Sequence, residues 1–312
     1  MARDVTTALK IPAMLGEGPR WHISHRCLYW VDIARNELHR FDPASGEGRV
    51  RRFDQPVGCF AFCAHHNGGG NDGDNGDGGF LLAMKNGCAW LADMDAEPVP
   101  FGPQILQDKP HHRFNDGRTD ARGRFWLGTM NEAKDAADAA LYKLDGDGTL
   151  TKIEGGMLTC NAAAFSADGR LFTHADTPSH ALRLYDVTAQ GDLANRRILH
   201  QFPHGEGRPD GGSFDAEGCY WSALFDGGRV VRINQHGAIV ETVPLPVSRP
   251  TMICFGGPDL KTAYVTSARI GLDDDALAAQ PEAGSIFSFR VDVPGLPEHP
   301  FHAEPPFHVE QS

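Results

Sequence analysis

The stretch Asp120-Ala-Arg-Gly-Arg-Phe-Trp-Leu-Gly128 decides the fold, because the chain repeats it. Two close copies follow, Ser166-Ala-Asp-Gly-Arg-Leu-Phe-Thr-His174 and Asp215-Ala-Glu-Gly-Cys-Tyr-Trp-Ser-Ala223, with their turn glycines 46 and then 49 residues further along. Three looser copies lie near Trp21, Gly79 and Gly257. The chain therefore divides into six units of about 52 residues, and repeats of about 40–50 residues with several short strands are typical of β-propeller blades.

Within each unit, short runs of alternating apolar and polar residues, such as Arg229-Val-Val-Arg-Ile233, are separated by Asp-Gly turns. This alternation predicts half-buried strands, and glycine supplies the positive φ that tight turns need. No segment of 12 or more residues has helical periodicity, and the alanine-rich stretch 131–140 is expected to be a loop. We predict an all-β fold, a single six-bladed β-propeller domain over residues 1–312 with four-stranded antiparallel blades.

Composition sets limits on the function. The 36 glycines and 21 prolines match a chain full of turns, and the Gly- and Asp-rich segment 66–79 is expected to be a flexible loop in blade two. A net charge of −12 repels phosphate backbones, which excludes general nucleic-acid binding. Seven scattered cysteines without a CxxC pair indicate reduced thiols. No apolar run approaches the roughly 20 residues of a membrane span, so a cytoplasmic monomer or weak homodimer is expected.

Polar residues that precede the aromatic strands form the candidate site. Asn115, Asn161 and Asp210 are spaced by 46 and 49 residues, the same intervals as the turn glycines. Glu17 holds a similar place in the first unit. In a propeller, residues of one register on the innermost strands meet around the central axis. Their oxygen atoms suit a hard divalent cation such as Ca²⁺, Mg²⁺ or Mn²⁺, and carboxylates also bind zinc and iron.

Four motifs extend this interpretation, in the order LGEGPRW (15–21), RFNDG (113–117), PDGGSFDAEG (209–218) and CFGGPDLKTAYVTSAR (254–269). With them the chain resembles the senescence marker protein/gluconolactonase/regucalcin family over essentially its whole length. The last motif is most similar to bacterial arabinono- and xylonolactonases. The resemblance implies a sugar lactonase that depends on one divalent cation.

The resemblance also implies roles for individual residues. It makes Glu17, Asn161 and Asp210 the metal ligands and Asp210 the catalytic residue, as general base or as the group that orients the attacking water. It assigns Arg113 to the substrate and Asn115 to the substrate or the metal. Glu132, in the loop that follows Met130, is also predicted to bind the substrate. One position departs from the family, which usually has glycine after the metal-binding asparagine where this chain has Ala162.

The predicted reaction is the metal-dependent hydrolysis of a 1,4- or 1,5-lactone of a pentose or hexose, such as L-arabinono-, D-xylono- or gluconolactone, to the aldonic acid in sugar oxidation. Two alternatives stay open: a non-catalytic calcium-binding propeller with a regulatory role, and a phosphotriesterase-like hydrolase at the same site. Asp116 is expected to shape the turn under Asn115, and Arg118 and Arg122 are expected to serve turns.

Overall fold

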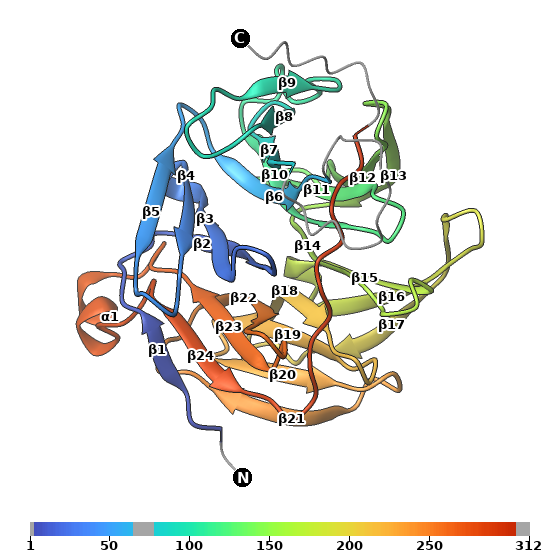
Figure 1. The fold of residues 1–312 in the computed structure, drawn as a ribbon. Coiled ribbons are helices and arrows are strands. Elements are labelled where there is room, and N and C mark those ends of the chain that lie inside the picture. Colours follow the sequence, from blue (N-terminus) through green and yellow to red (C-terminus); the bar gives the residue numbers. More distant parts are fainter. Residues whose placement is uncertain (1–2, 65–77, 304–312) are drawn as a thin grey trace.

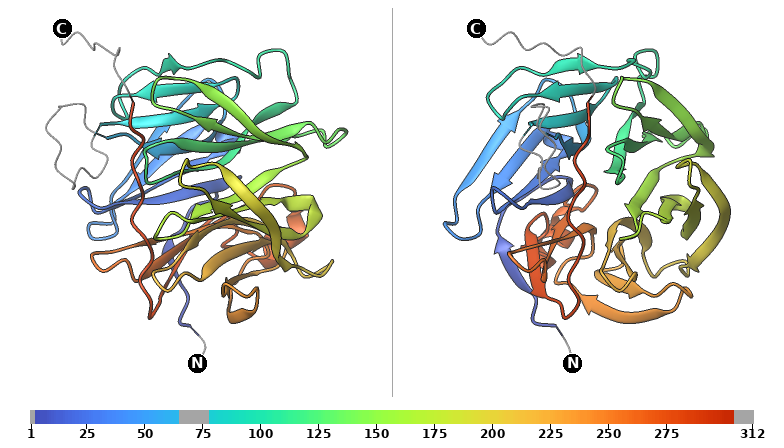
Figure 2. Two further views of the ribbon diagram at one scale, coloured as in Figure 1. Left: turned by 90° about the vertical axis from the view of Figure 1, so that its right-hand side faces the viewer. Right: turned by 45° about the vertical axis from the view of Figure 1, so that its right-hand side comes forward.

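Six antiparallel sheets of four strands surround a common axis in the computed structural model, which describes residues 3–64 and 78–303. Figures 1 and 2 show the sheets as blades of a ring, with the chain passing from one blade to the next. The predicted six-bladed β-propeller is therefore confirmed.

Each blade begins with its innermost strand, at the axis, and ends with its outermost strand, at the rim. Blades one to three consist of β2 (Gly16–His22), β3 (Cys27–Asp32), β4 (Glu37–Phe41) and β5 (Gly48–Arg52); β6 (Val57–Phe62), β7 (Phe80–Met84), β8 (Cys88–Leu91) and β9 (Val99–Phe101); and β10 (His112–Thr119), β11 (Phe125–Asn131), β12 (Ala139–Leu144) and β13 (Leu150–Met157). Blades four to six consist of β14 (Cys160–Phe165), β15 (Leu171–Asp176), β16 (Ala181–Val187) and β17 (Leu193–Gln201); β18 (Arg208–Phe214), β19 (Tyr220–Phe225), β20 (Arg229–Ile233) and β21 (Ile239–Pro244); and β22 (Pro250–Gly256), β23 (Thr262–Ser267), β24 (Ile286–Arg290) and β1 (Thr6–Leu9).

The repeated Asp-x-x-Gly-x-x-Trp pattern has a direct structural reason. Asp120 begins the turn between β10 and β11, and its carboxylate accepts hydrogen bonds from the backbone of the turn and, at 2.9 Å, from the indole of Trp126. Gly123 closes this turn with a φ of 74°. Asp215 binds the indole of Trp221 in the same way, also at 2.9 Å. The aspartate therefore ties each turn to the buried tryptophan of the following strand.

The core lies between neighbouring blades. The fully buried ring of Trp126 in blade three packs against Phe165 and Phe172 of blade four, with ring centroids 5.8 and 5.5 Å apart. Burial of such a side chain contributes about 2–3 kcal/mol. Apolar side chains on both faces of a blade thus hold it to its two neighbours, and the ring arrangement follows.

The ring is closed by the N-terminal strand. β1 pairs with β24, through Thr6 with Ser288 and Thr7 with Phe287, so blade six contains both ends of the propeller sequence. The sequence repeats did not reveal this pairing.

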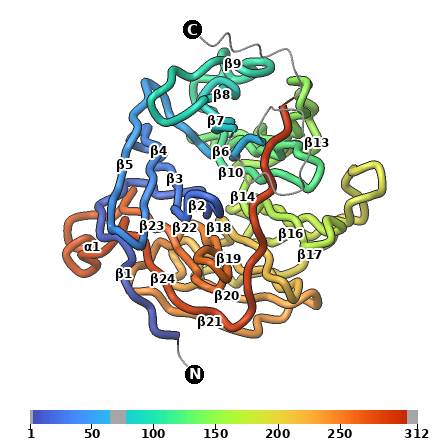
Figure 3. The backbone as a smooth tube through the Cα atoms, viewed as in Figure 1, coloured from blue at the N-terminus to red at the C-terminus, as the bar shows by residue number. Residues whose placement is uncertain are grey.

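Residues 291–303 cross the ring at one end of its axis (Figures 1 and 3), and we call them the crossing segment. Gly295 forms an isolated β-bridge with Asp215 of blade five, and Phe301 forms one with Cys63 of blade two. Between these anchors, the carboxylate of Glu298 pairs with Arg20 at 2.8 Å and with Arg118. The prediction that Arg118 serves a turn is wrong, because its guanidinium lies at the axis and also donates to Gly212 and Ser213.

The structure also bears on the predicted loops, helices, cysteines and membrane spans. Of the predicted loop 131–140, residues 132–138 form a loop, whereas Asn131 ends β11 and residues 139–140 begin β12. The Gly-rich loop 66–79 lies outside the described residues except for its last two positions. The described residues contain one α-helix, α1 (Asp274–Ala279), and two 3₁₀ turns, Ile33–Arg35 and Thr177–Ser179. All seven cysteines are unpaired. Within the described ranges, no helix is long and apolar enough to span a membrane.

Candidate functional site

The candidate residues gather at the end of the axis that lies opposite the crossing segment. That segment contacts the turns that follow the inner strands. Glu17 and Asn161, by contrast, are the second residues of β2 and β14, Asp210 is the third residue of β18, and Asn115 lies in the first half of β10. Because the inner strands all run towards the crossing segment, their starts meet at the other end, which we call the site end.

A β-bulge at the same place in four inner strands directs these side chains. The register of pairing shifts between Glu17 and Arg20, Phe114 and Gly117, Asn161 and Ala164, and Pro209 and Gly212. A bulge adds one residue to a strand and re-aims its side chains. Ala162 adopts a φ of 64°, so this alanine takes the left-handed conformation that a glycine would favour, at a cost of about 1 kcal/mol.

A chain of hydrogen bonds joins three of the predicted substrate residues to a predicted ligand. Arg113 donates from Nε to Glu132, at 2.9 Å, and from Nη1 to the amide oxygen of Asn115, at 2.7 Å. Asn115 donates from Nδ2 to the amide oxygen of Asn161, also at 2.7 Å. The structure therefore brings Glu132, Arg113 and Asn115 together beside Asn161, with Glu132 about half exposed.

The hydrogen-bond chain continues into blade five. Asn161 donates from Nδ2 to the hydroxyl of Thr177, at 2.8 Å, and Thr177 donates to the carbonyl of Pro209, at 2.9 Å. Pro209 directly precedes Asp210 in β18. Sequence analysis missed Thr177, which lies in a 3₁₀ turn after β15 and outside the repeated motif. It connects β14 and β18, the strands that carry Asn161 and Asp210.

The site holds an excess of buried acidic groups. Burial raises the pKa of Glu17 to about 8, and the charge of Asp116 adds to this effect. Burial also raises the pKa of Asp210 well above its usual value, with further contributions from the charges of Glu17 and Asp116. Arg113 opposes both shifts. A divalent cation between the carboxylates would relieve this repulsion.

The donor set fits such a cation. In the described part of the chain, the Asp210 carboxylate accepts no hydrogen bond, and Glu17 accepts one, from the amide of Gly18 at 3.1 Å. Apart from this one bond to Glu17, the described residues leave the carboxylate oxygens of Glu17 and Asp210 available to a ligand. The described residues hold no cluster of three His, Cys, Asp or Glu side chains that could bind a metal alone. A metal site here would therefore also need the amide oxygen of Asn161.

Asp116 has a larger structural role than expected. Its carboxylate accepts hydrogen bonds from the amide of Gly117, at 2.7 Å, and from the amide of Ala163 in the next blade, at 2.9 Å. The prediction placed it in a turn under Asn115, whereas it lies within β10 and holds the bulges of both β10 and β14. The bond to Ala163 also fixes the left-handed conformation of Ala162.

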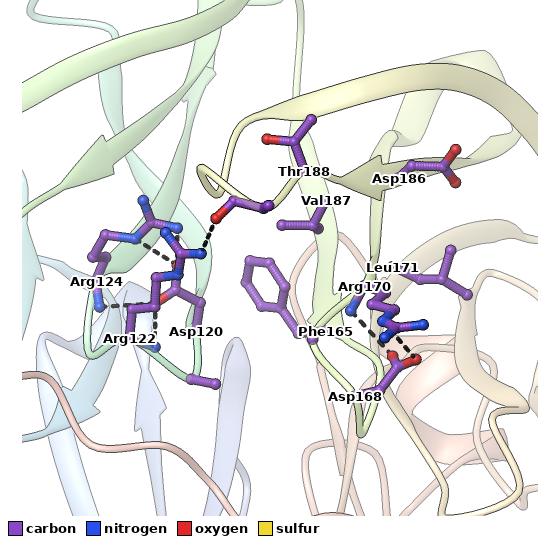
Figure 4. Close-up of a pocket in the computed structure, with 13 residues that line it drawn as sticks. Asp120, Arg122, Arg124, Phe165, Asp168, Arg170, Leu171, Asp186, Val187 and Thr188 are labelled. Atoms are coloured by element: carbon purple, nitrogen blue, oxygen red, sulfur yellow. Dashed lines mark hydrogen bonds and ion pairs between the residues drawn. The ribbon is translucent and has the colours of Figure 1, made fainter.

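A pocket of about 580 Å³ lies between blades three and four, away from these residues (Figure 4). It is lined by turn residues such as Arg122 and Arg124. Arg122 donates to the carbonyls of Ala189 and Gln190, and Arg124 pairs with Asp120. These cations are already bound within the protein, which agrees with the prediction that Arg122 serves a turn.

Known proteins resemble this chain along its whole length. A model of the SMP-30/gluconolactonase/LRE-like region matches residues 15–269. Over 302 residues the chain is 37% identical to 6-deoxy-6-sulfogluconolactonase of Pseudomonas putida. This alignment covers 96% of this chain and 98% of that protein. It is 34% identical to regucalcin of Danio rerio, with coverages of 95% and 98%.

A solved structure supports the same relationship. The crystal structure of regucalcin from Agrobacterium tumefaciens, described as a calcium-binding protein, superimposes with a TM-score of 0.88 at 27% identity. The match covers 96% of this chain and 98% of that one. As its motifs predicted, the chain belongs to the SMP-30/gluconolactonase/LRE-like family.

Proposed function

We propose that this protein hydrolyses a sugar lactone to the aldonic acid and is thus a carboxylic-ester hydrolase of sugar oxidation. The main support is the convergence of Glu17, Asn161 and Asp210 with Arg113 at one end of the axis. The 37% identical relative is named as a lactonase of a gluconolactone derivative, which supports the same chemistry. The ring size, 1,4 or 1,5, and the sugar are left to experiment.

Glu17, Asn161 and Asp210 would hold one divalent cation. When bound, such a cation polarises the lactone carbonyl and lowers the pKa of a bound water. The calcium-binding description of the Agrobacterium regucalcin puts Ca²⁺ first among the candidates, followed by Zn²⁺, Mg²⁺, Mn²⁺ and Fe²⁺.

The chain's own side chains supply the rest of the chemistry. Arg113 and Asn115 donate hydrogen bonds to ring and hydroxyl oxygens and orient the sugar, while Glu132 holds Arg113 in place. Asp210 orients the attacking water and accepts its proton. The water oxygen bonds to the carbonyl carbon, the ring C–O bond breaks, and the proton ends on the released hydroxyl group.

The decisive experiment uses metal-stripped protein and a panel of arabinono-, xylono-, galactono- and gluconolactone, with single metals restored one at a time. We expect lactone opening faster than the spontaneous rate, and only with metal present. The absence of a metal-dependent rate on every lactone would overturn the proposal. The name of the Pseudomonas relative adds 6-deoxy-6-sulfogluconolactone to this panel.

The same preparation separates a second candidate, calcium binding without catalysis, which the regucalcin relatives favour. Calorimetry that detects tight Ca²⁺ binding, together with no opening of any lactone or phosphotriester, would establish that alternative. Opening of a phosphotriester but of no lactone would instead identify a phosphotriesterase.

A further inference from the structure

Arg208 holds the same place in blade five as Arg113 holds in blade three, at the site end. Arg113 lies two residues before Asn115, and Arg208 lies two residues before the ligand candidate Asp210. Both arginines precede the bulge of their inner strand, where pairing is regular. The Arg113 guanidinium reaches Asn115 from this register, and Arg208 is the first residue of β18, with Asp210 the third. Arg208 therefore lies beside the proposed ligands.

The guanidinium groups of Arg208 and Arg249 both lie against the ring of Phe225. Its guanidinium carbon lies 5.3 Å from the centre of the Phe225 ring, and that of Arg249 lies 5.2 Å from the same centre. Both arginines also pair with Asp226, Arg249 through Nε at 2.6 Å. Two positive charges share one carboxylate, so this group of four residues, which we call the arginine pair site, carries a surplus positive charge.

The arginine pair site is held rigidly and is open to solvent. Arg208 begins β18, Arg249 directly precedes β22, and these inner strands belong to neighbouring blades (Figure 1). Asp226 adopts a φ of 60°, which turns the chain sharply after β19. The side chain of Arg208 is 29% exposed, so a ligand can reach it. A stacked, paired guanidinium is preorganised and loses little entropy when it binds an anion.

The positive charge of the arginine pair site contrasts with the negative charge of the whole chain. A chain of net charge −12 repels anionic ligands at long range, so a surplus positive charge at the edge of the site is unusual for this molecule. A neutral sugar lactone needs no surplus cation at the edge of the site. A substrate with its own negative charge does need one, at a distance from the carboxylates.

We propose that the arginine pair site binds a negatively charged group at the end of the sugar away from the lactone carbonyl, and that the preferred substrates are anionic aldonolactones. This rests on the lactonase function proposed above. Sulfonate, phosphate and carboxylate groups all present oxygen pairs that match the fork of a guanidinium. Arg208 is the contact residue, and Arg249 positions Phe225 and Asp226 behind it.

The test compares kcat/KM for 1,5-gluconolactone, its 6-phospho and 6-deoxy-6-sulfo derivatives, and glucaro-1,4-lactone in the wild type and in Arg208→Met. The wild type should prefer one or more anionic lactones, mainly through KM, and 0.5 M salt should reduce the preference. Arg208→Met should lower the anionic-to-neutral ratio about 10- to 100-fold, as expected for loss of a charge-assisted hydrogen bond. Arg208→Lys should retain part of the preference.

Arg290→Met is the matched control, because Arg290 pairs with exposed Asp259 on another part of blade six and should leave the ratio unchanged. If neutral lactones are hydrolysed but the anionic ones are not preferred, or if Arg208→Met keeps the ratio, the inference is wrong and the lactonase function stands. If no lactone is opened, the lactonase function fails. Calorimetry then still decides the anion site, because Arg208→Met should weaken binding of 6-phosphogluconate about tenfold relative to gluconate, and unchanged binding would overturn it.

Discussion

Asn115 donates a hydrogen bond of 2.7 Å to the amide oxygen of Asn161, which joins blades three and four at the axis. The amide nitrogen of Asn161 donates in turn to Thr177. These two bonds fix which end of the amide is oxygen, and a carbonyl oxygen has a second lone pair that can bind a cation. The orientation of one proposed ligand thus depends on two residues that are not ligands.

Replacement of Thr177 by valine should therefore weaken metal binding. The change leaves the Asn161 amide and the Pro209 carbonyl without their partner, and a lost partner of a ligand typically costs 10–100-fold in metal affinity. Titration calorimetry with Ca²⁺ measures this directly. Thr177→Ser keeps the hydroxyl and should bind nearly as the wild type does, whereas equal affinity in Thr177→Val would contradict the orienting role.

Asp210→Asn should reduce kcat/KM by a factor of about 10²–10⁴, the usual contribution of a general base. The amide has nearly the same shape but cannot accept a proton, and it removes one charge from the metal site. Asp186→Asn is the control, because Asp186 pairs with Arg197 at the outer edge of blade four. Near wild-type activity of Asp210→Asn would show that this assignment is wrong.

Glu298→Gln should destabilise the protein by about 3–5 kcal/mol, because it leaves two buried guanidinium groups without their charge partner. Chemical denaturation measures the loss, and Glu217→Gln, which breaks an exposed pair with Arg232, should cost less than about 1 kcal/mol. Equal effects of the two changes would show that the buried pair is not important for stability.

The ion pairs of Glu298 also predict that the folded protein becomes less stable in acid. Burial alone would raise the pKa of Glu298, but the charges of Arg118 and Arg20 outweigh burial and hold the pKa below its usual value. A depressed folded-state pKa means that the stabilisation is complete above the unfolded-state value, about 4.3, and is lost as the pH falls through the folded-state value. Glu298→Gln should remove this part of the pH dependence.

His174 should make the protein less stable between pH 6.5 and 5. Burial lowers the pKa of this histidine from 6.5 to about 3, and neither ring nitrogen has a hydrogen-bond partner among the described residues. The unfolded chain takes up a proton below pH 6.5 that the folded chain does not, so stability falls as the pH is lowered, by about 1.4 kcal/mol per pH unit.

His174→Leu removes this titration, and the difference in free energy of unfolding between pH 6.5 and 5 should shrink by about 2 kcal/mol. Denaturation curves at both pH values measure it. His236→Gln, at an exposed position, should keep the wild-type difference. An unchanged pH dependence in His174→Leu would mean that the ring takes up its proton over the same pH range in the folded and unfolded protein.

The fold could be predicted because the blades repeat one local arrangement of a turn and the strand that follows it. Asp120 and Asp215 perform the same bonds to turn and tryptophan, so the pattern is visible in the sequence. The placement of Asn115, Asn161 and Asp210 at a common end of the axis followed from the same periodicity, although Asn161 directly precedes its bulge and the other two lie one residue further on. Their roles as ligands and catalytic groups stay predictions.

What the sequence did not reveal lies outside the repeat. Thr177 lies in a 3₁₀ turn after β15, and the equivalent turn after β3 in blade one has Ile33 at that place. Glu298 comes from the non-repeated crossing segment. Asp116 was noticed, but its bond to Ala163 depends on the distance between two blades. Contacts of this kind are set by tertiary packing and leave no local pattern.

The closure of blade six by β1 makes the ring vulnerable to loss of its first residues. Without Thr6–Leu9, β24 would become an open edge whose backbone amides and carbonyls lack partners. Such an edge readily recruits a strand from another molecule, and the apolar Ile286 and Phe287 would lie along it. Proteolytic trimming of the N-terminus would therefore be expected to cause aggregation well before it affected the chemistry at the axis.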